Sequence, residues 1–331
     1  MNDGERRALL NALQYEFPLT PQPYHDLAHR MGAEADTVME RVRDLMAQGV
    51  VRAVRAVFEA RRLGHRSLLV GAHVVPEALQ GVAARVSTHP GVSHNYAREH
   101  HFNLWFTLTL PDDADVPRVV RALLPGVPSS EVLLLPALRV FKVDARSALG
   151  GETEGPAAPQ AQEGEPRPFT PAEVDRRAVY ALGQDLPVVE RPFAGLAGDV
   201  GLAENELLER AAFYLEEGIM RRYGAALNHR RIGLTANGMT GWVVPPARVD
   251  AVGQVLAGFP QVSHCYERPV YPNWPYNLFT MIHGGSREEV ERLAAQMSER
   301  VQVEDYAILY STIEFKKRAV SFFAPWNEAG P

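Results

Sequence analysis

The sequence predicts an α+β protein built as a tandem duplication. The first indication is a repeat, because Val92–Arg98 (VSHNYAR) recurs as Val262–Arg268 (VSHCYER), and Phe141-Lys142 recurs as Phe315-Lys316. The second is a helical period in the first part of each copy, and the third is an alternation of strand and helix patterns in the last part. Matches that keep their order along the chain indicate two diverged copies of one unit.

The first part of each copy has the order of a winged helix-turn-helix domain. Helical periods over Arg6–Tyr15, Tyr24–Met31 and Asp36–Gln48 precede an alternating, strand-like Val50–Phe58. Gly32 separates the second and third helices where a helix-turn-helix turns. The second copy repeats the pattern, with helices expected at Asp175–Gly183, Phe193–Val200 and Glu204–Glu217.

The last part of each copy predicts a ferredoxin-like βαββαβ domain. In copy one the expected elements alternate as strand, helix, strand, strand, helix, strand. Their ranges are Ser67–Val74, Glu77–Thr88, Val92–Arg98, Phe102–Leu110, Val116–Leu124 and Leu133–Val143.

Five segments follow from these patterns. A stretch rich in Gly, Pro, Glu, Gln and Ala separates the copies and cannot bury enough apolar surface to fold, so we expect a flexible linker. The expected segments are a helix-turn-helix-like domain (1–62), a ferredoxin-like domain (63–149), the linker (150–168), a second helix-turn-helix-like domain (169–232) and a second ferredoxin-like domain (233–331).

Composition narrows the class of protein. Hydrophobic residues make up 46% and charged residues 22% of the chain, as in ordinary soluble proteins. Neither a secretory signal nor a long apolar run is evident, so we expect a cytoplasmic protein without a membrane segment. Cys265 is the single cysteine, which excludes an intramolecular disulfide and an all-cysteine metal site. The net charge of −6 argues against nucleic acid as the main partner.

The repeated strand carries three polar residues on one face. Residues two apart in a strand point the same way, so His94, Tyr96 and Arg98 form a row that the second copy repeats. Such a row offers a proton donor near neutral pH and a cation suited to carboxylates. One histidine in a strand is usually structural, but a row that is kept while its surroundings diverge favours a ligand site.

The turn after each row adds candidate ligand contacts. In copy one these are His100, His101 and Asn103, and in copy two they are Trp274 and Asn277. Aromatic side chains here would suit a flat, apolar ring.

The domain order resembles the feast/famine (Lrp/AsnC-type) transcription regulators, which makes DNA binding one hypothesis. A recognition helix usually carries basic and amide side chains. The third helix of copy two instead carries five glutamates and only Arg210, and that of copy one is also acidic. We therefore expect these helices to serve as scaffold and DNA to be an unlikely partner.

The two rows and the residues after them resemble motifs of the siroheme decarboxylases. The resemblance extends over nearly the whole of both copies. The motifs are His94–His100 with Phe102–Thr107, and His264–Pro269 with Trp274–Gly284. They are similar to those of the two subunits of that family, here fused in one chain. The resemblance implies removal of carboxylate from two ring acetates of siroheme, giving didecarboxysiroheme for heme or heme d1. It also implies a pocket lined by histidines and arginines.

The chemistry needs a proton and a grip on several carboxylates. A pyrrole acetate loses carbon dioxide once the adjacent ring carbon is protonated, so no cofactor beyond the substrate's own ring is required. We therefore assign His94 and His264 as general acids, or as ligands of the substrate iron, and predict no other metal site. The expected substrate-binding residues are Tyr96, Arg98, His100, His101, Asn103, Lys142, Tyr266, Arg268, Trp274, Asn277, His283 and Lys316.

Two alternatives stay open beside the enzyme: a ligand-responsive transcription regulator and a non-catalytic tetrapyrrole-binding protein. For the enzyme we expect the ferredoxin-like halves to pack as an internal pseudo-dimer, with further homo-oligomers open. Cys265 beside His264 is expected to pack as a small apolar group, because copy one has Asn95 there.

Overall fold

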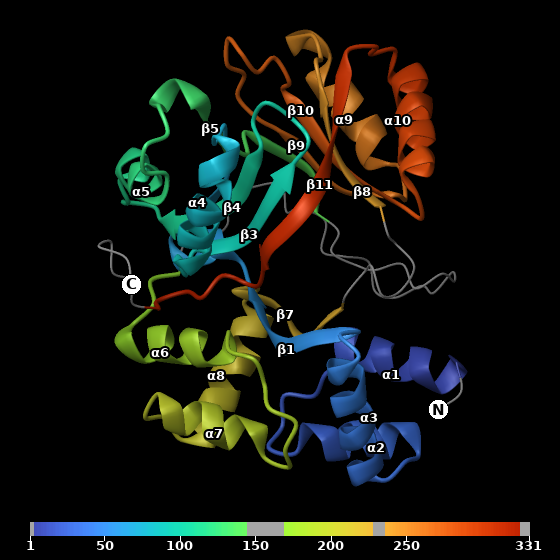
Figure 1. Cartoon of the computed structure of the whole chain (residues 1–331). Coiled ribbons are helices and arrows are strands. Elements are labelled where there is room, and N and C mark those ends of the chain that lie inside the picture. Colours follow the sequence, from blue (N-terminus) through green and yellow to red (C-terminus); the bar gives the residue numbers. More distant parts are fainter. Residues whose placement is uncertain (1–2, 144–168, 228–235, 325–331) are drawn as a thin grey trace. The chain divides into compact units, whose positions relative to one another are not determined.

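The computed structural model of the protein describes residues 3–143, 169–227 and 236–324 (Figure 1). Its contacts divide the chain into two units. Both helix-turn-helix copies fall in one unit and both ferredoxin-like copies in the other, so the units do not follow the tandem order of the sequence. The predicted linker, 150–168, lies outside the described residues. Within the described ranges, no helix is both long and apolar enough to cross a membrane.

Each copy contributes three helices and one strand to the helical unit. The elements are α1 (Asp3–Tyr15), α2 (Pro23–Met31), α3 (Ala35–Ala47), β1 (Val51–Phe58), α6 (Glu173–Leu182), α7 (Pro192–Asp199), α8 (Glu204–Glu216) and β7 (Met220–Leu227). Gly32 ends α2 in the left-handed conformation, at φ +63°, as glycine does most easily. The strands β1 and β7 pair antiparallel, so the two copies share one small sheet.

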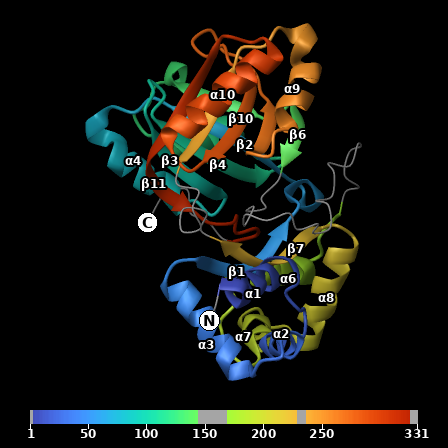
Figure 2. The same ribbon diagram turned by 90° about the vertical axis from the view of Figure 1, so that its right-hand side faces the viewer.

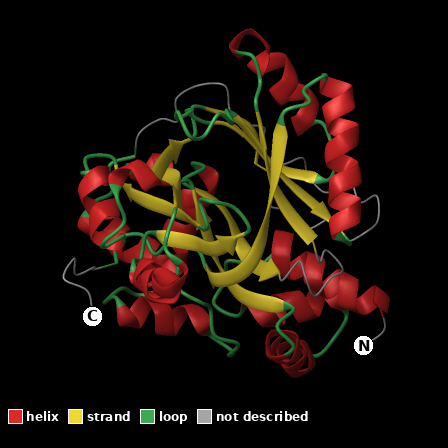
Figure 3. Cartoon of the chain, turned by 45° about the horizontal axis from the view of Figure 1, so that its top comes forward, coloured by secondary structure: helices red, strands yellow, loops and turns green. Residues whose placement is uncertain are grey.

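The second unit contains one nine-stranded sheet with the order β5-β2-β4-β3-β11-β8-β10-β9-β6. Copy one supplies β2 (His65–Ala72), β3 (Val92–Arg98), β4 (Leu104–Pro111), β5 (Val132–Pro136) and β6 (Arg139–Val143). Copy two supplies β8 (Ala236–Trp242), β9 (Val262–Glu267), β10 (Leu278–Gly284) and β11 (Tyr306–Lys317). Figure 3 shows these strands in yellow, and the helices of this unit pack on one face of the sheet.

The helices of each copy cover their own strands. They are α4 (Pro76–Thr88) and α5 (Val116–Leu123) in copy one, and α9 (Val249–Ala257) and α10 (Arg287–Val301) in copy two. Figure 2 shows α10 beside β10, with which it is in contact. Each copy thereby buries its own apolar core between helices and sheet.

The two ferredoxin-like copies exchange their last strands. The first half of β11 pairs with β8 of its own copy, and the second half, Ser311–Lys317, pairs with β3 of copy one. In return, β6 of copy one pairs with β9 of copy two. Backbone hydrogen bonds therefore join the copies at two places, as an internal pseudo-dimer requires.

This exchange corrects the single strand expected over Leu133–Val143. The structure has two strands there, β5 within its own copy and β6 on copy two. Pro136 ends β5 because proline has no N–H to continue the ladder. The chain resumes pairing when the Leu138 N–H donates to the Glu267 carbonyl at 2.9 Å.

A third apolar cluster joins the copies on the sheet face away from the helices. Its buried members come from both copies, so a residue of this cluster that was expected to contact a ligand also packs the two copies together. They are Phe102, Trp105, Leu133, Leu135, Met239, Trp274, Phe279 and Leu309.

Candidate active site

The two predicted rows lie on the sheet face that the helices leave uncovered. On the helix side of β3, the Asn95 side chain donates to the Ala83 carbonyl of α4 at 2.9 Å. On the helix side of β9, the Cys265 thiol lies 3.7 Å from the Gly253 carbonyl of α9. The alternating neighbours, His94 and His264 among them, therefore take the opposite face.

Within each row the side chains lie against one another. The rings of His94 and Tyr96 are 6.2 Å apart, and the Arg98 guanidinium lies over the Tyr96 ring at 5.6 Å. In copy two the rings of His264 and Tyr266 are 5.9 Å apart, with Arg268 at 4.9 Å from the tyrosine ring. Both copies thus keep one arrangement of acid, phenol and cation.

Both row arginines reach into the other copy, Arg98 as a buried and Arg268 as a half-buried residue. Arg98 is only 6% exposed, and its Nη1 donates to the Leu309 carbonyl of copy two at 2.7 Å. Arg268 donates to the Leu135 carbonyl of copy one in the same way. Burial lowers the pKa of each guanidinium to about 10, so both stay cationic at neutral pH.

Neither guanidinium has an acidic partner. Among the described residues no carboxylate pairs with Arg98 or Arg268, and the Nε of each is buried without a hydrogen-bond partner. A buried charge without a counter-charge is costly unless a ligand supplies one. The structure therefore has two positions whose charge favours an anionic ligand.

Serine hydroxyls hold the row histidines. Ser93 Oγ is 2.9 Å from His94 Nδ1, and Ser263 Oγ is 2.8 Å from His264 Nδ1. His283, expected to bind substrate, also lies 2.6 Å from Ser263 Oγ through its Nε2. The structure thus brings His283 to His264 through one serine.

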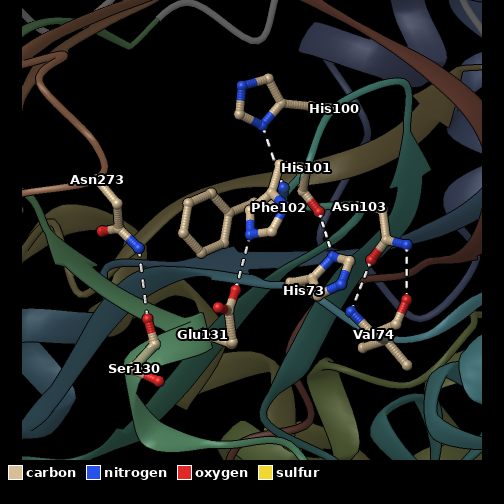
Figure 4. A network of polar contacts seen from close by, with 9 residues as sticks. All are labelled: His73, Val74, His100, His101, Phe102, Asn103, Ser130, Glu131 and Asn273. Carbon is tan, nitrogen blue, oxygen red and sulfur yellow. Dashed lines mark hydrogen bonds and ion pairs between the residues drawn. The ribbon is translucent and has the colours of Figure 1, made fainter.

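The turn after β3 is held by local contacts, as Figure 4 shows. His101 bonds Glu131 at 2.7 Å, and its ring stacks on His73 with centroids 4.2 Å apart. His100 Nδ1 accepts from the Phe102 N–H at 3.1 Å. These contacts organise the turn. That His100 and His101 contact the substrate stays a prediction.

Asn103 and Asn277 each close a loop onto the backbone. Asn103 accepts from the Val74 N–H at 2.9 Å and donates to the Val74 carbonyl at 2.8 Å (Figure 4). Asn277 makes the same two bonds to Val244. Both amides are therefore occupied by the fold rather than presented to a ligand.

Trp274 is fully buried between the copies. Its ring packs against Trp105 at 5.1 Å and Phe102 at 5.7 Å. The tryptophan expected to line a ring pocket thus joins the apolar cluster that holds the halves together.

Lys142 and Lys316 point to the helix-covered side, away from the rows. Lys316 Nζ donates to the carbonyls of Ser87 and His89 at 2.8 and 2.9 Å, at the end of α4. Lys142 Nζ donates to the Phe259 carbonyl, just beyond α9, at 3.0 Å. The expectation that they reach substrate carboxylates on the row face is corrected, because Lys316 bonds carbonyls at the end of α4 and Lys142 a carbonyl just beyond α9, each in the other copy.

Lys317 is the cation that the sequence interpretation missed. It pairs directly with His94 across β11 and β3, so the two side chains share a face. Strand alternation alone would not have identified it, because the pairing is irregular between Glu314 and Lys316, which places both Phe315 and Lys316 on the helix side. Lys317 also acts on His283. Burial, and to a lesser extent the charge of Lys317, lower the pKa of His283 to about 4.

Within the described residues, no group of three or more His, Cys, Asp or Glu side chains could hold a metal ion. Burial raises the pKa of the Cys265 thiol to about 12, in keeping with packing. Arg210, the single arginine of α8, bonds Asp175 at 2.5 Å within its own domain.

Comparison with known proteins agrees with the fold and with the duplication. The model of an AsnC-like ligand-binding domain matches residues 62–142 and 231–316. The model of a siroheme decarboxylase NirDL-like HTH domain matches residues 6–52 and 175–221. Each model therefore matches twice, once in each copy.

Individual relatives match either the whole chain or one copy of it. The siroheme decarboxylase of Hydrogenobacter thermophilus is 36% identical, covering 96% of this chain and 94% of the relative. The siroheme decarboxylase beta subunit of Methanosarcina barkeri is 42% identical over 44% of this chain and 96% of its own length. A crystal structure of the siroheme decarboxylase NirDL with an iron-uroporphyrin III analogue has a TM-score of 0.72 and 33% identity, covering 97% of this chain and 95% of that one. The chain belongs to the siroheme decarboxylase family.

Proposed function

We propose that this protein is a siroheme decarboxylase, a carboxy-lyase that converts siroheme to didecarboxysiroheme by removing two ring acetate carboxylates. The observation that carries the proposal is the pair of His-Tyr-Arg rows, each with a buried guanidinium that lacks an acidic partner among the described residues. The membership of the chain in the family supplies the substrate class. The product would serve heme or heme d1 biosynthesis.

Each decarboxylation replaces a carboxylate by a proton. A proton adds to the pyrrole carbon beside the acetate, which makes the ring an electron acceptor. The bond to the carboxylate then breaks, its electron pair enters the ring and carbon dioxide leaves. The exocyclic methylene takes a proton to become methyl, and the ring carbon gives its proton back. The substrate ring accepts the electrons, so we propose no additional cofactor.

In this scheme the row histidines exchange the protons. His94 and His264 are half-buried on the uncovered sheet face, and each lies beside a tyrosine. Histidine is the side chain most often used for general acid catalysis near neutral pH. Ligation of the substrate iron is the other role open to either histidine.

The arginines would hold the acidic side chains of the substrate. A carboxylate bound at Arg98 or Arg268 offsets a charge that the fold otherwise buries alone. The same guanidinium bonds a carbonyl of the other copy, so its place depends on the pairing of the two halves. Lys317 beside His94 adds a further cation on this face.

Arginine variants test the proposal. Arg98→Gln and Arg268→Gln remove the buried charge, and Arg292→Gln, an exposed residue of α10, is the matched control. We expect the Kd for siroheme, from anaerobic absorbance titration, to rise by about 10- to 100-fold in either row variant, since bonds to charged groups contribute about 1.5–3 kcal/mol. The control should bind as wild type does.

The titration also separates the alternatives. Tight binding by wild type without loss of carbon dioxide would favour a tetrapyrrole carrier. Absence of binding together with a salt-dependent shift of promoter DNA would favour a regulator. Unchanged affinity in both row variants would contradict the role given to the arginines.

A further inference from the structure

Copy two contains a hydrogen-bonded chain that ends on its row histidine. Asn237 of β8 lies 2.6 Å from His283 Nδ1, through its Oδ1. His283 Nε2 lies 2.6 Å from Ser263 Oγ, which in turn lies 2.8 Å from His264 Nδ1. Three strands, β8, β10 and β9, therefore contribute to one line of side chains.

The chain has a defined direction. The amide oxygen of Asn237 can only accept, so His283 Nδ1 carries the proton that it donates. His283 is neutral, because burial and then the charge of Lys317 lower its pKa to about 4. Its Nε2 must therefore accept the Ser263 hydroxyl proton. The serine oxygen is then left to accept from His264 Nδ1.

Copy one lacks this chain at the equivalent positions. The N–H of Thr109 donates to the Gly91 carbonyl just as the N–H of His283 donates to the Gln261 carbonyl, so Thr109 is the counterpart of His283. The Thr109 hydroxyl lies 2.6 Å from Ser67 Oγ, where copy two has His283 and Asn237. Ser93 still bonds His94, but no second histidine stands behind it at this position.

We infer that His283 is a positioning residue which, through Ser263, holds His264 with its proton on Nδ1 and reserves Nε2 for exchange with the substrate. This inference deepens the proposed function and rests on it for the catalytic role alone. In copy two the proton then leaves from Nε2, where the N–H bond breaks as the C–H bond forms. The His264 imidazole is left with its proton on Nδ1, the tautomer that the hydrogen-bonded chain of side chains already favours. No rearrangement of the imidazole therefore accompanies proton transfer.

The two halves therefore have different duties. In copy two, His283 accepts the Ser263 proton, and His264 is thereby held in one tautomer. In copy one the Ser67–Thr109 pair occupies that position and gives Ser93 no such fixed acceptor. Among the described residues, the titratable and charged groups that act on His283 include His264, reached through Ser263 on β9, and Lys317 on β11. Asn237 on β8 faces it as a neutral group.

The test substitutes the residue pair of copy one into copy two. The full-length Asn237→Ser/His283→Thr variant carries a pair that the fold accepts in the other half. Nitrogen-15 NMR of the histidine rings, without substrate, reads the His264 tautomer directly. We expect wild type to carry the proton on Nδ1 and the variant to show a mixture with the Nε2–H form.

Kinetics then separate positioning from binding. The same variant should lose about 10- to 100-fold in kcat with KM within about twofold of wild type, because a misplaced proton weakens acid–base catalysis more than substrate binding. His283→Gln, whose amide oxygen can accept the serine proton, should retain more of kcat than the double variant. Ser67→Asn/Thr109→His, which installs the pair in copy one, should move His94 toward the Nδ1–H form.

An unchanged His264 tautomer in the double variant would overturn the inference, and so would a shifted tautomer with unchanged kcat. If the double variant fails to fold, the ring spectrum of the copy-one variant decides, and an unchanged His94 there would also overturn it. The ring spectra need no siroheme. A wild-type protein that has the predicted tautomer but leaves siroheme intact would contradict the proposed function and not the hydrogen-bonded chain.

Discussion

Replacing Asn277 with alanine should destabilise the protein without weakening its affinity for substrate. The side chain accepts from the Val244 N–H at 2.9 Å and donates to the Val244 carbonyl at 2.8 Å. Val244 is 2% exposed, so water cannot readily replace either bond. Each backbone group left unpaired costs about 1–3 kcal/mol, which gives a loss of about 2–6 kcal/mol.

Calorimetry and denaturant unfolding would measure this loss. A domain of this size loses roughly 2–4 °C in Tm for each kcal/mol. The fraction that remains folded should keep the wild-type KM, because the amide serves the fold. Asn273→Ala is the control, since that exposed side chain makes a single 3.4 Å contact with the Ser130 carbonyl. Unchanged stability with a raised KM would refute the reasoning and restore Asn277 as a substrate contact.

Three further predictions concern acid stability, packing and substrate binding. Burial, and to a lesser extent the charge of Lys316, lower the pKa of His89 from its usual 6.5 to about 4 in the folded state. The contribution of His89 to the free energy of unfolding is therefore complete above pH 6.5 and is lost as the pH falls toward 4. Unfolding of His89→Asn should lack up to about 3 kcal/mol of that dependence, and an identical pH profile would contradict the assignment. Gly253→Ala places a methyl 2.5 Å from the Phe141 ring and should cost about 1–3 kcal/mol in unfolding experiments, whereas an unaltered Tm would argue against β6 docking on α9. Lys317→Met should raise the KM for siroheme with little change in Tm, and the reverse pattern would assign the lysine to the fold.

Strand alternation correctly predicted the faces of the rows. Because successive residues in a strand face opposite sides, His94 and Tyr96 had to share a face, with Asn95 on the other. The structure places Asn95 against α4 and leaves the histidine and tyrosine on the uncovered side. Helix-turn-helix elements were equally predictable, since their helical periods and Gly32 are local signals.

Long-range pairing was not predictable in the same way. An alternating strand pattern fits any partner, so the exchange of β6 and β11 between copies has no local signal. The interpretation of Lys316 failed for a related reason, because the register shift between Glu314 and Lys316 has no local signal and places Lys317 rather than Lys316 beside His94. Trp274 was taken for a pocket residue because a buried interface and a ring pocket favour the same aromatic side chains.

The third helix of copy two is tied to the first helix of its own domain. Asp175 of α6 accepts from Arg210 at 2.5 Å and from the Tyr214 hydroxyl at 2.8 Å, which ties α8 to its own domain. The one arginine of α8 is thus engaged within the protein. That the helix serves as scaffold rather than as a DNA reader stays a prediction.

The central claim is that the protein decarboxylates siroheme, and its most direct test is turnover. Purified protein would be incubated with siroheme under anaerobic conditions, and the extracted tetrapyrrole would be analysed by mass spectrometry beside His94→Ala and His264→Ala variants. We predict loss of two carbon dioxide units with wild type and slower loss in at least one variant. Siroheme recovered unchanged from the wild-type reaction would contradict the account.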